Sequence, residues 1–147
     1  MKRITTLSFF MLLCWITAFA IPRAEYPRPQ FERNAWINLN GEWTYSFDFG
    51  GSGLEREWFK STGFDQKIIV PFCPESKLSG VEYKDFINHM WYHRTISIPQ
   101  DWANKQVLLN FGAVYYKSEI YIDGVFAARH FGGTSSFQVD ITPYVKA

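Results

Sequence analysis

The stretch EIYIDGVFAARH, residues 119–130, decides the fold class. Apolar and aromatic residues precede and follow Asp123-Gly124, and this dipeptide is the strongest short-range signal for a two-residue β-hairpin turn. The sequence therefore predicts two antiparallel strands that meet at Asp123-Gly124.

Other short strand patterns recur along the chain, separated by turn-forming residues. In residues 41–48, Trp43, Tyr45 and Phe47 alternate with polar residues, which is the period of a half-buried strand and places Trp43 on a core face. Further strands are expected at 67–70 (KIIV), 90–98 (MWYHRTISI), 106–111 (QVLLNF) and 135–141 (SSFQVDI). About seven strands, with a helical turn only in 54–60, predict an all-β domain with the fold of a β-sandwich or jelly roll.

The strand expected at 90–98 has two unlike faces, because successive side chains of a strand point to opposite sides. The face that carries most of its apolar residues predicts one wall of the core. The core-facing residues are predicted to be Tyr92, Ile96 and Ile98. Arg94 shares that face and is expected to pair with an acid or with backbone carbonyls near the sheet edge. Trp91 lies on the other face.

The first 20 residues have the pattern of a secretory signal peptide. Lys2 and Arg3 precede an apolar run, and Ala-Phe-Ala at 18–20 is a cleavage pattern. The run is too short for a membrane-spanning anchor. Residues 21–30 hold three prolines and predict an extended leader. We therefore expect a signal peptide (1–20), a leader (21–30) and one domain (31–147), exported to the periplasm or secreted.

Charge and cysteine content narrow the classes of partner. Removing Lys2 and Arg3 with the signal peptide leaves 13 basic against 14 acidic residues, a net charge of −1. Neither sign dominates, which argues against nucleic acid or an anionic membrane as a partner. One cysteine, Cys73, remains and excludes an intrachain disulfide. Its apolar neighbours predict a buried thiol rather than a nucleophile.

No residue pattern marks a metal site, a cofactor site or a catalytic pair. His89 and His93 share a strand face, but nothing nearby completes a set of three metal ligands. A retaining glycosidase needs two carboxyl groups about 5 to 5.5 Å apart. The acids of this chain are scattered through turns and strand ends, where solvation or turn capping is their usual role. The sequence thus predicts no metal, no cofactor and no catalytic residue.

The loop before residue 90 offers side chains that suit a sugar. Asp85, Asn88 and His89 supply hydrogen-bonding groups for a polyol, and Trp91 supplies an aromatic face. These four residues are the predicted substrate contacts.

Five motifs occur in the order and spacing of one protein family. They are LNGEWTYSFD (39–48), VPFCPESKLSG (70–80), MWYHRTISIP (90–99), VLLNFGAVYYKSEIYIDGV (107–125) and HFGGTSSFQVDITPYV (130–145). Together they resemble the N-terminal sugar-binding domain of glycoside hydrolase family 2, which includes β-galactosidases, β-glucuronidases and β-mannosidases. The resemblance covers residues 31–145.

The resemblance implies a jelly-roll β-sandwich like the galactose-binding domains. In that family, an immunoglobulin-like sandwich and a (β/α)₈ barrel follow, and the barrel carries both catalytic glutamates. A barrel takes about 250 residues, so we expect this chain to be a non-catalytic fragment of an exported β-glycosidase. Loops of this domain reach the barrel's active-site mouth in whole enzymes, and the loop before residue 90 is the candidate here by position alone.

The β-galactosidase branch is the expected specificity, with a β-galactoside or related glycan as ligand and the absent immunoglobulin-like and barrel domains as partners. Two alternatives stay open. One is a free-standing secreted carbohydrate-binding module without hydrolase activity, because a fold does not fix a function. The other is a purely structural packing domain, which predicts an exposed apolar patch.

Overall fold

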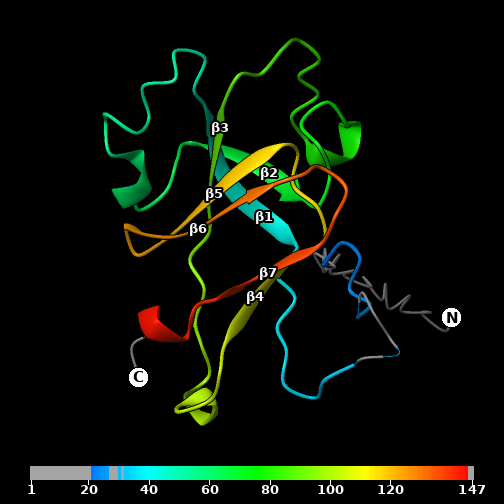
Figure 1. Ribbon diagram of the computed structural model, residues 1–147. Coiled ribbons are helices and arrows are strands. Elements are labelled where there is room, and N and C mark those ends of the chain that lie inside the picture. The colour runs from blue at the N-terminus through cyan, green and yellow to red at the C-terminus, as the bar shows by residue number, and fades with distance from the viewer. Residues whose placement is uncertain (1–20, 27–29, 31, 146–147) are drawn as a thin grey trace, which may run out of the picture.

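The computed structural model describes residues 21–26, 30 and 32–145, so the predicted signal peptide lies outside the described residues. The described chain consists of short strands and 3-10 turns (Figure 1). The strands are β1 (Gly41–Phe47), β2 (Gln66–Val70), β3 (Met90–His93), β4 (Leu108–Phe111), β5 (Lys117–Ile122), β6 (Val125–Phe131) and β7 (Phe137–Asp140). No helix in these described ranges is long and apolar enough to cross a membrane.

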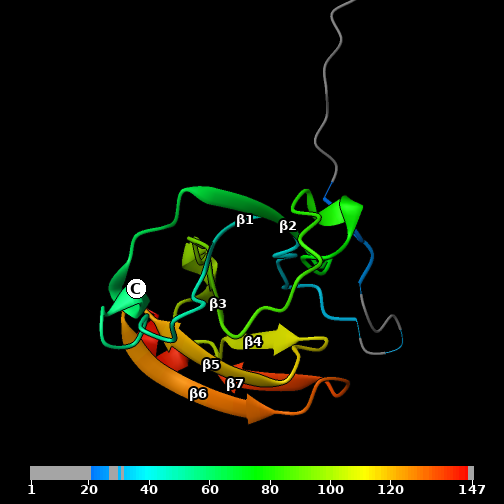
Figure 2. The same ribbon diagram turned by 90° about the horizontal axis from the view of Figure 1, so that it is seen from above.

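The strands pair into three antiparallel sheets with the orders β2-β1-β3, β4-β7 and β5-β6. Figure 2 shows β1 and β2 on one side of the molecule and the curved β4 to β7 on the other. This arrangement confirms the predicted all-β class. The jelly-roll topology stays a prediction, because the recorded ladders form three small sheets.

The alternation in β1 produces one apolar sheet face. Trp43 pairs with Ile68 of β2, and Tyr45 pairs with Tyr92 of β3. Residues that lie directly opposite in an antiparallel ladder share a face, so these four side chains and Phe47 lie together. Ile68 is completely buried and Tyr45 nearly so. The prediction that this face of β1 builds a core is confirmed.

The segment between β2 and β3, residues 71–89, covers this aromatic face. The ring of Tyr83 packs on Phe47 with 4.7 Å between centroids. Tyr92 keeps 41% of its surface exposed. Desolvation of its hydroxyl beneath this segment, with a smaller effect of the charge on Glu75, nevertheless raises the pKa of Tyr92 to about 12. Tyr92 is therefore only partly the core residue expected from the sequence.

A second core lies on the β4 to β7 side of the molecule. Its buried residues are Val107, Ile120, Val139 and Ile141. Ile98 and Trp102, which follow β3 in the chain, pack against it. The two layers are thus joined by the chain that runs from β3 to β4.

The predicted hairpin is confirmed as β5-β6. Asp123 and Gly124 have φ angles of 49° and 78°. Two successive positive φ angles are the requirement of a type I′ turn, whose twist matches that of paired strands.

The strand expected at 90–98 is shorter in the structure. The ladder between β1 and β3 ends at Thr44 and His93, and residues 94–98 pair with no other strand of the described ranges. The guanidinium of Arg94 donates a hydrogen bond to the carbonyl oxygen of Glu42 and so occupies an acceptor of β1 just past the end of the ladder. The expectation that Arg94 pairs with a backbone carbonyl is confirmed.

Two further predictions need correction. Cys73 is exposed rather than buried. The amide of Phe72 donates to the carbonyl of Ile69 in a tight turn directly after β2, and Phe72 rather than Cys73 is half-buried there. The helical turn expected within 54–60 is confirmed, but three more 3-10 turns were not expected. They are η3 (Lys77–Ser79), η4 (Gln100–Trp102) and η5 (Thr142–Tyr144), in addition to η2 (Trp58–Lys60).

Candidate functional site

The carboxylate of Asp48 ties together the end of β1, the turn after it and β3. Its Oδ1 accepts a hydrogen bond from the Ser52 amide (2.9 Å), and its Oδ2 accepts from the Gly53 amide (2.8 Å) and from Trp91 Nε1 (3.2 Å). The residue is only 5% exposed. Burial alone would raise the pKa of Asp48, but these three hydrogen bonds and the nearby His89 outweigh it, and the pKa is lowered. The group therefore stays ionised and anchors the turn.

Trp91 is held from several sides at this turn. A Cβ atom on Gly53 would lie 2.7 Å from both Trp91 Cε2 and Asp48 Oδ2, so a side chain at residue 53 would force both to move. The Trp91 ring packs on Trp58 (6.3 Å between centroids) and on Tyr121 of β5 (6.0 Å). Both the polar edge and the ring of Trp91 are thus engaged within the protein.

The predicted contact residues next to Trp91 also belong to this turn. Asn88 Nδ2 donates to the Phe49 carbonyl (3.2 Å), and the His89 carbonyl accepts from the Asp48 amide (2.9 Å). Asp85 is exposed, and no described hydrogen bond or ion pair ties it to the turn. The structure thus brings three of the four predicted contacts together, while their contact with a substrate stays a prediction.

The lowered pKa of Asp48 makes stability depend on pH. A carboxyl group whose folded pKa is depressed contributes stability above its ordinary value, here 3.8, and loses it as the pH falls through the lower folded value. We expect the free energy of unfolding to fall on acidification below about pH 4, and to fall less steeply in Asp48→Asn. Urea unfolding at a series of pH values measures both slopes.

The difference in slope between the unaltered protein and Asp48→Asn reports the contribution of Asp48 alone. Glu119 and Asp140 also have lowered pKa values, but the unaltered protein and the variant both contain them, so their contributions cancel. Equal slopes would contradict the anchoring role of the ionised Asp48 carboxylate.

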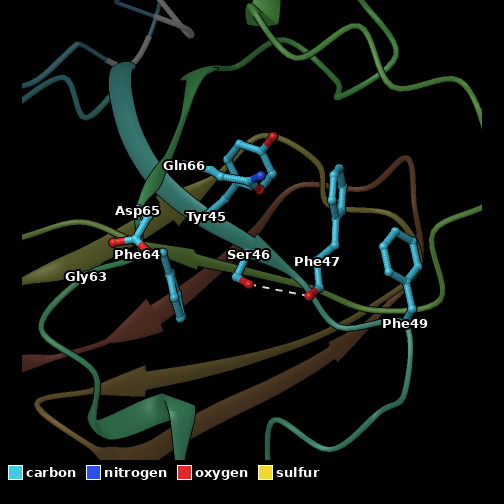
Figure 3. A pocket seen from close by; sticks show the side chains of 8 residues that line it. All are labelled: Tyr45, Ser46, Phe47, Phe49, Gly63, Phe64, Asp65 and Gln66. Carbon is cyan, nitrogen blue, oxygen red and sulfur yellow. Dashed lines mark hydrogen bonds between the residues drawn. The ribbon is translucent and has the colours of Figure 1, made fainter.

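A groove of about 510 Å³ lies where β1 runs on past Gln66, the first residue of β2 (Figure 3). Tyr45, Phe47 and Phe49 point to one side of the strand, whereas Phe64 points to the other (Figure 3). The groove is therefore a notch at a sheet edge, and its side chains do not converge on one ligand.

An exposed aromatic cluster, here called the tyrosine patch, lies at the end of the β5-β6 pair opposite the hairpin turn. It consists of Tyr115, Tyr116 and Phe131, which are 87%, 58% and 56% exposed. The Tyr116 ring lies 5.8 Å from Tyr115 and 6.3 Å from Phe131 between centroids. A Cβ atom on Gly133 would meet the Tyr115 ring, which therefore lies against that backbone. Exposed rings of this kind suit a sugar face or a protein partner.

The most enclosed acid of the second layer is already paired. The carboxylate of Glu119 binds Lys117 Nζ and Arg129 Nη2 (both 2.9 Å) and accepts from the Tyr121 hydroxyl (3.1 Å). The hydrogen bond from Lys117 is the main reason that the pKa of Glu119 is lowered. Within the described ranges, no three or more His, Cys, Asp or Glu residues are grouped so that they could hold a metal ion.

Comparison with protein families decides the identity of the domain. The model described as "Glycosyl hydrolases family 2, sugar binding domain" matches residues 37–147. The chain belongs to this family. The resemblance inferred from the five sequence motifs is thereby confirmed.

Relatives of this family 2 domain include several enzymes. A β-glucuronidase of Felis catus is 29% identical over an alignment of 134 positions that covers 83% of this chain and 20% of that enzyme. A β-glucuronidase of Streptococcus agalactiae is 29% identical over 114 residues, 78% of this chain and 18% of that enzyme. The chain thus spans about a fifth of the length of the curated relatives that it matches.

The solved structures similar to this chain that are named here are also β-glucuronidases. The β-glucuronidase of an uncultured Clostridium species superposes with a TM-score of 0.63 at 28% identity, covering 74% of this chain and 19% of that one. The Ruminococcus gnavus β-glucuronidase gives a TM-score of 0.62 at 26% identity, covering 74% and 18%. The relatives named here are β-glucuronidases, so they give no support to the expected β-galactosidase branch.

Sequence reasoning missed the tyrosine patch of the family 2 domain. The signal was present in the segment AVYYK, residues 113–117, where two aromatic residues stand between two strands. Strand alternation would bury at most one of two consecutive side chains. The pair at 115 and 116 was therefore the place to look for exposed aromatic surface.

Proposed function

We propose that this chain is the non-catalytic, N-terminal sugar-binding domain of an exported β-glucuronidase-like enzyme of family 2, with jelly-roll topology. The observation that carries the proposal is the family match over residues 37–147, together with relatives that are β-glucuronidases about five times as long. Its role is to add surface to the substrate pocket and to pack against the catalytic part of the enzyme.

The hydrogen bonds of three acidic residues support a non-catalytic role for these residues. Asp48 and Glu119 are held by hydrogen bonds inside the protein, and Asp140 binds the Thr142 amide (2.9 Å) and Gln106 (2.9 Å). Retaining hydrolysis needs a nucleophile and an acid/base on either side of the bond to be broken. In this proposal, both come from the larger part of the enzyme.

The tyrosine patch is the surface best suited to face that pocket. Tyr115 and Tyr116 present aromatic rings for the apolar face of a sugar, and their hydroxyls offer hydrogen bonds. Asp85, Asn88 and His89 form the second candidate surface, because their side chains border the Asp48 turn or the loop that leads to it.

A chimera tests the proposal. The full chain takes the place of the matching domain in the Ruminococcus gnavus β-glucuronidase, and the same enzyme without that domain is the control. We expect the chimera to hydrolyse a chromogenic β-glucuronide about tenfold faster than the control, or more, because missing pocket surface misplaces the substrate. A chimera no better than the control would refute the proposed role.

The choice between the two surfaces is a second test in the chimera. Tyr115→Ala and Tyr116→Ala are each expected to raise KM for the β-glucuronide about three- to tenfold, the range of one lost aromatic contact. Leu78→Ala removes a side chain of similar exposure on η3 and is the matched control. Asn88→Ala and His89→Ala test the loop predicted from the sequence. A larger KM effect of the loop variants would move the contact surface there.

A free-standing carbohydrate-binding module makes a different prediction. The chain alone would then bind glucuronate or galactose with a Kd tighter than about 1 mM, which corresponds to about 4 kcal/mol. Calorimetry with both sugars measures this. Galactose binding without glucuronate binding would favour the β-galactosidase branch.

Export is proposed from the first 20 residues alone. Lys2, Arg3 and the apolar run before Ala-Phe-Ala form a signal-peptide pattern. Cell fractionation and N-terminal sequencing of the mature protein test it, and a chain that retains Met1 in the cytosol would contradict it.

A further inference from the structure

Residues 95–98, which follow β3, have the side-chain pattern of a strand but no strand partner in the part of the chain that the structure describes. Thr95 and Ser97 are exposed, whereas Ile96 and Ile98 are half-buried. This period of two is the pattern of a strand with one covered face. In Figure 1 the chain leaves β3 and runs extended to the turn before β4.

Side chains and neighbouring contacts hold this segment in place. Ile98 packs against the buried cluster of the second layer. At one end, the Arg94 guanidinium binds the Glu42 carbonyl, and at the other the Pro99 carbonyl accepts from the Trp102 amide (3.0 Å). The segment is thus fixed at both ends and along one face.

The backbone of residues 95–98 makes no hydrogen bond within the described part of the chain. Among the described residues, none of its N–H or C=O groups takes part in a hydrogen bond. Backbone groups in partly buried chain are normally paired, because an unpaired one loses its water without compensation. An extended, fixed and unpaired segment is therefore a template for another strand.

Space for a neighbour opens at the start of this segment. A groove of about 480 Å³ lies where the chain after His93 parts from β1. Glu42, Trp43 and Thr44 line one side, and His93, Arg94 and Thr95 line the other. The groove thus reaches Thr95, the first residue of the unpaired segment.

We propose that residues 95–98 bind an extended strand supplied by the remaining part of the family 2 enzyme, which pairs with this segment through backbone hydrogen bonds. This inference rests on the proposed function. The incoming strand carries apolar side chains at alternate positions to continue the face of Ile96 and Ile98, and uncharged polar residues on the face of Thr95 and Ser97. Main-chain pairing supplies affinity, and the alternation supplies register.

The rest of the same enzyme is the source because the relatives carry this domain in chains about five times as long. A strand within one chain meets the segment at a high effective concentration, so a short pairing of this kind suffices there. A strand from a separate protein would need a larger interface to bind as well.

Hydrogen exchange by mass spectrometry tests this in the chain alone and in the chimera described above. In the chain alone, the amides of residues 95–98 are expected to exchange about 100-fold faster than those of Thr44 and Ser46 in the β1 ladder. In the chimera, the same amides slow by about 100-fold. Ser97→Pro removes one donor and blocks pairing, so it restores fast exchange, whereas Ser97→Thr keeps the protection.

Exchange and activity of the chimera separate the two proposals. An active chimera with fast exchange at 95–98 overturns the strand site and leaves the proposed function standing. An inactive chimera with slow exchange at 95–98 overturns the proposed function and leaves the strand site standing. Inactivity with fast exchange overturns both, and activity with slow exchange supports both. Slow exchange of 95–98 in the chain alone would also overturn the site, because the backbone would then be paired already.

Discussion

Asp48→Ala is expected to lower the free energy of unfolding by about 3 kcal/mol or more. The substitution leaves the amides of Ser52 and Gly53 and the indole N–H of Trp91 without their acceptor. A buried donor that loses its partner costs about 1 to 3 kcal/mol. The Gly53 amide is buried, the other two donors are partly buried, and Asp48 itself is 5% exposed, so the three losses together reach about 3 kcal/mol. Urea unfolding near neutral pH, followed by tryptophan fluorescence, measures the change.

Glu55→Ala is the matched control for this prediction. Glu55 is an exposed acid in the same stretch between β1 and η2, so its removal tests the loss of one negative charge alone. A change within about 0.5 kcal/mol is expected for such a surface site. If Asp48→Ala stays within the same limit, the turn does not depend on this carboxylate.

Ile68→Ala is expected to cost about 3 to 4 kcal/mol of unfolding free energy. Ile68 is fully buried in β2 beside Trp43 on the aromatic face of the sheet. Truncating it removes apolar contact and leaves a cavity that the paired strands cannot close. The measurement is the urea midpoint at an unchanged slope, which identifies a loss of stability rather than a change in the unfolded chain.

Ile69→Ala separates burial from residue type. Ile69 is the neighbouring isoleucine in β2, but it is half-buried and points to the opposite face. Its truncation is expected to cost about half as much, since the loss scales with the apolar surface removed from water. Equal losses at the two positions would show that residues 71–89 do not seal the face that holds Ile68.

The strands that the sequence predicted correctly are those whose signal is local. The β5-β6 hairpin follows from Asp123-Gly124, and β1 follows from alternation over residues 41–48. The shortened β3 could not be found in this way. Residues 90–98 alternate throughout, and only the ladder to β1, which ends at Thr44, shows where pairing stops.

The candidate site was also predicted only where its residues are close together in the sequence. Asn88, His89 and Trp91 were grouped because they are close in sequence, and they do meet at one turn. Asp48, the hydrogen-bond partner of His89 and Trp91, follows a strand end more than 40 residues earlier, as the separation of 43 between Asp48 and Trp91 shows. No pattern in the sequence marks such a distant hydrogen bond, so the anchoring of Trp91 had to come from the coordinates.

The exposed thiol of Cys73 is a natural site for attaching a fluorescent label. It is the one cysteine of residues 21–147, and it stands on the segment that covers the aromatic face of β1, near the Tyr92 hydroxyl. A maleimide dye would react there without any engineered residue. Its emission would then report movement of residues 71–89 away from the sheet, separately from the tryptophan fluorescence, to which Trp43 on the covered face and Trp91 on the opposite face both contribute.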